Sequence, residues 1–168
     1  MRRMKYEREE GNDTASPKKR SKKTALMAAV DILARQEQSE KKLREKLARK
    51  GYEDGEIQRA VDRLVEMHYL NDAEACARQF AFLYEESRSS VRQICVKLMQ
   101  RGFDSGLVRD CIPPDSFERE TQAALRVLSL RFKPSADQQK MKANLYSKGF
   151  DSSVIRAAVD AFAASPEH

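Results

Sequence analysis

The sequence predicts an all-α protein: three tandem three-helix repeats, with a flexible basic tail at the N-terminus. Three observations support this fold class. From residue 25 onward the apolar residues recur at helical spacing. Strand signals are weak, because the chain has no alternating Val/Ile/Thr runs and no Asn-Gly hairpin turns. The chain also repeats internally, with units that align on Gly51, Gly102 and Gly149.

The residues around these three glycines predict a helix that ends in a tight turn. Each glycine has a leucine four positions before it, a cation directly before it and an aromatic residue directly after it. A glycine just past the last helical turn adopts positive φ without a Cβ penalty, and the leucine and the aromatic residue then occupy the contacting positions of a Schellman motif. The leucines are Leu47, Leu98 and Leu145, and the aromatic residues are Tyr52, Phe103 and Phe150.

Polar residues at fixed offsets mark the expected helix starts. Ser90 and Ser135 precede Gln93 and Gln138 at the spacing of a capping box, and Ser39 holds a similar place with Lys42 three residues later. After each turn, Asp54, Ser105 and Ser152 are the predicted caps of the next helix.

A further helix is expected before each helix pair, near residues 25–37, 72–87 and 115–132. The predicted organisation is therefore a tail at 1–23 and three repeats at 24–70, 71–113 and 114–164. Units this small would struggle to bury a core alone, so neighbouring units are expected to pack together.

The positive charge is concentrated at particular positions of the repeats, although the repeats as a whole carry almost no net charge. The chain carries a net charge of +6, and the first 24 residues hold nine bases and four acids, which leaves only +1 for the remainder. Within the repeats, the middle helices at 39–50, 90–101 and 137–148 carry +4, +3 and +2. These helices would form a discontinuous basic stripe, or they are ordinary solvated faces with cations near helix C-termini.

The stripe supplies the candidate binding residues: Lys41, Lys42, Arg44, Lys46, Arg88, Arg92, Lys97, Arg101, Lys140, Lys142 and Lys148. A short basic run, Lys18 to Lys23, is either a nuclear-import or phosphate-binding signal or a solubilising tail with nonspecific affinity for polyanions.

No motif indicates catalysis, a metal or a cofactor. The sequence has no Gly-rich phosphate loop, no Cys-x-x-Cys pair and no His-Glu-x-x-His motif. Cys76 and Cys111 fall at positions expected to be buried, whereas Cys95 aligns with basic residues and is a candidate exposed, reactive thiol. Three widely spaced cysteines indicate reduced thiols in the cytosol or nucleus. We expect a non-enzymatic, cytoplasmic protein without cofactor, metal or membrane segment.

The ordered motifs resemble the RecX family, the regulators of RecA recombinase. The run from Ser39 through Leu43 and Leu47 to Gly51 is similar to one family segment, and His68-Tyr69-Leu70-Asn71-Asp72 resembles the next. Arg92-Gln93-Ile94 with Leu98 and Gly102 resembles a third, and residues 140–162 repeat the turn of Gly149. Lys42, His68, Asn71 and Ala75 depart from the family pattern, and the link at 88–90 lacks its glycine.

The resemblance implies an elongated, curved helical array that binds along the groove of the RecA–DNA filament. It also implies suppression of ATP hydrolysis, strand exchange and co-protease activity, as a modulator of DNA repair and the SOS response. We expect the protein to be a monomer. The resemblance assigns structural roles to Ser39, Leu43, Leu47, Gly51, Tyr69, Leu70, Asp72, Gly102 and Gly149. Two alternatives stay open: a protein that binds DNA directly through its basic helices and tail, and a general helical-repeat adaptor for proteins.

Overall fold

The structure is a computed structural model that describes residues 23–166, and every regular element in that span is a helix. The helices are α1 (Ala25–Arg35), α2 (Glu40–Arg49), α3 (Asp54–Glu66), α4 (Asp72–Glu86), α5 (Val91–Gln100), α6 (Ser105–Asp110), α7 (Phe117–Arg131), α8 (Gln138–Ser147) and α9 (Ser152–Ala163). The all-α prediction is confirmed. The predicted tail lies outside the described residues, apart from Lys23.

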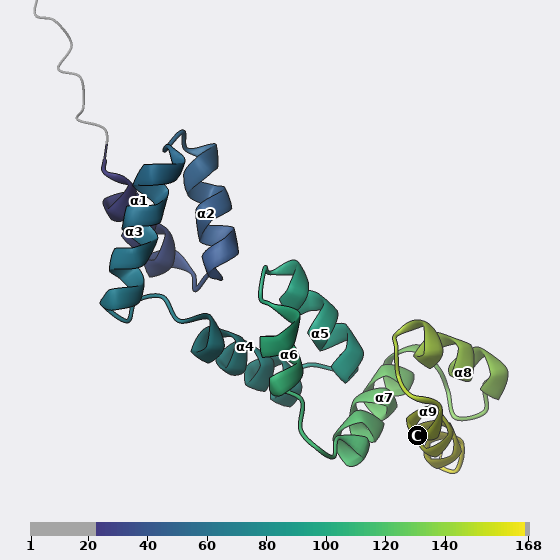
Figure 1. The fold of residues 1–168 in the computed structure, drawn as a ribbon. Coiled ribbons are helices and arrows are strands. Elements are labelled where there is room, and N and C mark those ends of the chain that lie inside the picture. The colour runs from purple at the N-terminus through teal and green to yellow at the C-terminus, as the bar shows by residue number, and fades with distance from the viewer. Residues whose placement is uncertain (1–22, 167–168) are drawn as a thin grey trace, which may run out of the picture.

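The helices form three separate hydrophobic cores in chain order. Helices α1–α3, α4–α6 and α7–α9 each enclose one core, and we call these groups the first, second and third unit. Figure 1 shows the units following one another in an elongated row instead of surrounding one common centre. We propose unit boundaries at 24–70, 71–113 and 114–164, which this separation of the cores supports.

All three middle helices end in the predicted Schellman motif. The φ angles of Gly51, Gly102 and Gly149 are 86°, 91° and 80°. In the first unit the Tyr52 N–H donates to the Leu47 carbonyl at 3.3 Å, and the Gly51 N–H donates to the Ala48 carbonyl at 2.9 Å. The other two units repeat both bonds, so the repeat alignment identified real turns.

Helix α3 ends in the same motif without a glycine. His68 has a φ of 58°, and its N–H donates to the Val65 carbonyl, while the Tyr69 N–H donates to the Leu64 carbonyl. Position 68 is often glycine in the RecX pattern that the sequence resembles. The left-handed backbone at this position favours glycine, because a glycine has no Cβ to strain the turn. Beyond the turn, Leu70 is buried and Tyr69 is exposed.

The helix starts differ from the sequence prediction at several positions. Ser39 and Ser90 are N-caps as expected. The capping box predicted at Ser135 is wrong, because α8 begins after Asp137, whose carboxylate accepts from the Gln139 N–H at 2.8 Å. The predicted caps of the third helices are wrong by one residue: α3, α6 and α9 begin after Glu53, Asp104 and Asp151.

The second unit has a short third helix. Helix α6 has only 6 residues, against 13 in α3 and 12 in α9. Pro113 and Pro114 lie three and four residues beyond the end of this helix, and a proline disfavours helical backbone in the residue before it, here Ile112. Cys111 lies just past this helix and is only half-buried, contrary to the expectation of a buried site. Cys76 is fully buried, and Cys95 is half-buried instead of exposed.

We predict different costs for alanine at two of the turn glycines. Gly51→Ala adds the strain of positive φ, about 1 kcal/mol. Gly102→Ala adds the same strain and places a Cβ 2.5 Å from the Ser39 Oγ of the first unit. We expect the second variant to lose roughly 1–2 kcal/mol more in the free energy of unfolding, measured by urea denaturation. Equal losses would contradict a close approach between the units at Gly102.

The Cys76 thiol is predicted to resist alkylation in the folded protein. Burial raises its pKa to about 12, and the nearby Cys111 thiol adds to the shift. Roughly one thiol in ten thousand is then ionised at pH 8, and only the thiolate reacts. The raised pKa also means that stability present below about pH 8.5 declines as the pH rises toward 12. Mass spectrometry after iodoacetamide treatment at pH 8, with and without urea, tests this protection; rapid native labelling of Cys76 would contradict it.

Candidate functional site: a basic groove between α5 and α8

A groove of about 620 Å³ lies between α5 of the second unit and the C-terminal end of α8 in the third. Arg92, Val96, Lys97 and Gln100 line it from α5, and Tyr146 and Lys148 line it from the α8 side. Three cations therefore face this space, and none of its lining residues is acidic. Because residues from both units line the groove, it exists only where the second and third units meet.

A second hollow of about 560 Å³ adjoins this groove. It shares Ser89, Gln93 and Lys148 with the first and adds Arg88 and Arg131, together with the carboxylate of Glu86. The two hollows extend the basic surface along the junction toward α7.

The junction is held by the serine that begins α5. Ser90 is fully buried, and its Oγ accepts from the Gln93 N–H at 3.1 Å, which caps α5. The same hydroxyl donates to the Lys148 carbonyl at 2.7 Å, at the C-terminal end of α8. One side chain thus satisfies an orphan N–H of its own helix and an orphan carbonyl of the next unit.

Two consecutive residues of α7 complete the contact with the second unit. The Glu120 carboxylate accepts from the Val91 N–H at 2.7 Å, so the N-terminus of α5 has caps from both units. The Arg119 guanidinium donates to the carbonyls of Leu83, Tyr84, Ser87 and Ser89, which lie at and beyond the end of α4. It also lies 4.7 Å from the centre of the Tyr84 ring. Burial lowers the pKa of Arg119, yet an arginine remains charged at neutral pH.

The first and second units meet through the same serine geometry. The Ser39 Oγ caps α2 and donates to the Arg101 carbonyl at 2.7 Å. The Asp72 carboxylate accepts from the Glu40 N–H at 2.9 Å, in the role that Glu120 has at the other junction. Burial raises the pKa of Asp72, while the hydrogen bond from Glu40 acts in the opposite direction.

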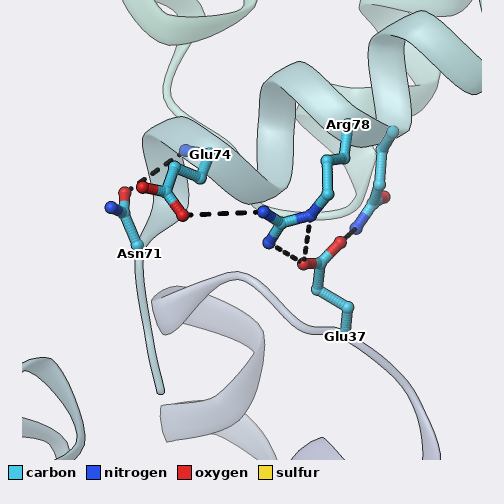
Figure 2. A network of polar contacts seen from close by, with 5 residues as sticks. Glu37, Asn71, Glu74 and Arg78 are labelled. Atoms are coloured by element: carbon cyan, nitrogen blue, oxygen red, sulfur yellow. Dashed lines mark hydrogen bonds and ion pairs between the residues drawn. The ribbon is translucent and has the colours of Figure 1, made fainter. Parts of the chain in front are cut away.

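Figure 2 shows that an exposed ion-pair network accompanies this first junction. Glu37, between α1 and α2, accepts from Arg78 of α4, and Arg78 also pairs with Glu74 at 3.5 Å. Asn71 caps α4 by accepting from the Glu74 N–H. Each exposed ion pair of this kind contributes little to the stability of the junction. Among the described residues, the first junction has no counterpart of the half-buried Arg119 and the four carbonyls to which it donates.

Only some of the predicted binding residues come together. Arg92, Lys97 and Lys148 share the main groove, and Arg88 lines the adjoining one. Arg101 instead donates to Gln79 at 2.8 Å. Lys42 and Arg44 pair with Glu45 and Glu40 of their own helix. Lys41, Lys46, Lys140 and Lys142 line neither hollow.

The residues with family-assigned structural roles lie where helix ends and cores require them. Leu43 and Leu47 are fully buried in the first core, and Leu70 is buried beside them. Ser39, Asp72 and Gly102 meet at the first junction, and Gly149 lies on the groove. Tyr69 is 70% exposed and lines a shallow apolar hollow beside Val30 and Leu33.

Three residues of this region were missed from sequence. Arg119 and Glu120 lie on the helix expected near residues 115–132, for which the sequence predicted no contact with another unit, and their spacing carries no motif. Tyr146 lies three positions before Gly149, where the other units have Ala48 and Met99. An aromatic residue at a repeat position that holds alanine or methionine in the other units could have identified Tyr146 from the sequence.

A row of three-helix units with a basic groove at one junction defines a helical-repeat binding protein. Across residues 23–166, no group of three or more His, Cys, Asp or Glu side chains is placed to hold a metal ion. Over the same span, no helix has the length and apolar character needed to cross a membrane.

Comparison with known proteins assigns the family. The family model described as "RecX, first three-helix domain" matches residues 25–64. Regulatory protein RecX of Neisseria meningitidis serogroup C is 31% identical over 144 residues, covering 82% of this chain and 90% of that protein. Regulatory protein RecX of Caldanaerobacter subterraneus is 30% identical over 141 residues, covering 82% and 70%. The chain belongs to the RecX family, and it is therefore a regulatory protein and not an enzyme.

Solved structures support the fold independently. The crystal structure of RecX from Lactobacillus salivarius matches with a TM-score of 0.71 at 19% identity, over 82% of this chain and 94% of that one. A second crystal structure of regulatory protein RecX matches with a TM-score of 0.70 at 20% identity, over 81% and 70%. The arrangement of units in a row is thus shared with these proteins.

The double role of Ser90 predicts a larger effect than that of an ordinary cap. Ser90→Ala removes the cap of α5 and leaves the Lys148 carbonyl without its donor, so we expect a loss of roughly 2 kcal/mol in unfolding free energy. The matched control is Thr24→Ala, because the Thr24 Oγ1 accepts from the Met27 N–H of its own helix and has no hydrogen bond to another unit among residues 23–166. It should lose about 1 kcal/mol. Chemical denaturation of both variants measures the difference, and equal losses would refute the inter-unit bond.

Proposed function

We propose that this protein binds the RecA–DNA filament and inhibits the recombinase, ATPase and co-protease activities of RecA. Membership in a family of RecX regulatory proteins supports RecA as the partner. The observation that carries the binding proposal is the groove between α5 and α8, where Arg92, Lys97 and Lys148 converge without an acidic neighbour in the lining. We expect a monomer acting in the cytoplasm.

The remaining basic residues differ in how readily they could contact a partner. Arg88 would extend the contact surface, since it lines the adjoining hollow. Lys41, Lys46, Lys140 and Lys142 have no ion pair among the described residues, so they remain candidates for contacts along a long partner. Lys42, Arg44 and Arg101 would have to exchange an internal contact for one with the partner.

A second candidate function is direct binding to DNA. A groove that gathers three cations and excludes carboxylates suits a polyphosphate backbone as well as an acidic protein surface. Under this alternative, binding to naked DNA in the absence of RecA would be tight and would fall steeply with salt.

Charge removal in the groove is predicted to weaken inhibition of RecA. In a DNA-dependent ATPase assay of the cognate RecA, a triple variant with Arg92→Gln, Lys97→Gln and Lys148→Gln should need roughly tenfold more protein, or more, for half inhibition. The matched control removes three exposed cations from the third helices: Arg59→Gln, Arg109→Gln and Arg156→Gln. It should inhibit like the wild type.

The wild-type protein tests whether RecA is inhibited, and the groove variant tests whether the groove is responsible. If the wild type leaves ATP hydrolysis unchanged at stoichiometric amounts with filaments formed, the proposed inhibition of RecA is wrong. If the groove variant inhibits as well as the control variant, the groove is only a solvated surface. Circular dichroism of both triple variants checks that the helices are intact.

A further inference from the structure

We infer that the groove between α5 and α8 is a site for single-stranded nucleic acid, in which the Tyr146 ring stacks on one unpaired base while Arg92, Lys97 and Lys148 contact the phosphates. The inference rests on the proposed role of this groove as the binding surface for a nucleoprotein filament, and it adds the substrate class and an aromatic contact residue.

The exposure of Tyr146 is the first observation. Its side chain lines the groove and is 77% exposed, the highest value among the large hydrophobic residues that are exposed in residues 23–166. No hydrogen bond from its hydroxyl is present within that span. Val96 on the facing helix is 42% exposed, so the groove offers a small apolar surface between its cations.

The position of the cations is the second observation. Arg92 lies across the turn that follows α8, because a Cβ built on Gly149 would be 3.2 Å from the Arg92 Cδ. Lys148 adjoins that glycine, and Lys97 lies five residues after Arg92 on α5. An exposed aromatic ring among cations is the pattern of single-strand binding grooves, where bases stack on rings and phosphates meet Lys and Arg.

The repeat supplies an internal comparison. At the equivalent positions of the first junction, Met99 replaces Tyr146 and Glu45 replaces Val96. Glu45 pairs with Lys42 at 2.9 Å, and that hydrogen bond lowers the pKa of the Glu45 carboxyl, so a negative charge persists there. The combination of a ring with unpaired cations is therefore specific to the second junction and is not imposed by repeat geometry.

The ring distinguishes between classes of partner. In a duplex the bases are stacked on one another and unavailable to Tyr146, whereas a single strand presents unpaired bases. An acidic peptide would gain the contacts with the cations but has no base to stack on the ring. Single-stranded nucleic acid uses both features of the groove.

A tryptophan reporter tests the stacking directly, because the sequence contains no tryptophan. In the full-length Tyr146→Trp variant, a short oligothymidylate should quench the fluorescence strongly at low salt, whereas an abasic deoxyribose-phosphate oligomer or polyglutamate should quench it little. The control reporter is Tyr69→Trp, at an exposed tyrosine in the first unit. Equal quenching of both reporters, quenching by polyglutamate equal to that by oligothymidylate, or no quenching at all would each overturn the inference.

Affinity measurements with otherwise wild-type protein give a second test. Tyr146→Ala should weaken oligothymidylate binding by about tenfold to a hundredfold, whereas Tyr146→Phe should bind like the wild type because the ring is retained. Equal affinity of the Ala variant and the wild type would overturn the stacking role. These measurements contain no RecA, so their failure is distinguishable from a failure of the proposed inhibition.

Discussion

The array depends on a serine hydroxyl shared between two units. Because a hydroxyl has one proton and two lone pairs, Ser39 and Ser90 each accept from their own helix and donate to the next unit's carbonyl at 2.7 Å. The bond joins the N-terminus of one middle helix to the C-terminus of the next, so it fixes the point at which successive middle helices meet. The glycine beside each accepting carbonyl has no Cβ, and this permits the close approach.

The two junctions share this bond, the glycine beside the accepting carbonyl and a carboxylate that accepts from the next N–H, and they differ in their remaining contacts. The second junction adds the half-buried Arg119 guanidinium on four carbonyls, and its Glu120 carboxylate is buried, whereas Asp72 is only half-buried. The first junction adds the exposed Glu37–Arg78 pair, which is weakened by salt. The groove with its cations and Tyr146 therefore lies at the more firmly held of the two junctions, where the geometry of a binding site is better preserved.

The sequence was informative wherever backbone geometry restricts residue choice. Positive φ strongly favours glycine, as at residues 51, 102 and 149, so these turns and hence the repeat were predictable, whereas the turn at His68 was not. Helix starts were less predictable, because Asp, Ser and Glu at adjacent positions can all cap, and the carboxylates of Asp104 and Asp151 prevailed over the following serines. The groove was predictable only in part. The sequence shows that Arg92, Lys97 and Lys148 are charges on the middle helices. Which of the many cations share a groove depends on how the units pack, which the sequence does not show. Arg119 donates to carbonyls some 30 to 36 residues earlier in the chain, a contact that no local motif encodes.

The residue that takes the serine position in the third unit gives α8 a different kind of cap from α2 and α5. Asp137 lies twelve residues before Gly149, as Ser39 and Ser90 do before their glycines. Its carboxylate caps α8 by accepting from Gln139, but an ionised carboxylate has no proton to donate to a carbonyl. A serine at this position could accept and donate at once, as Ser39 and Ser90 do, whereas Asp137 only accepts. Within the described part of the chain, the N-terminus of α8 is therefore capped within its own unit and lacks the second hydrogen bond by which α2 and α5 hold the following unit.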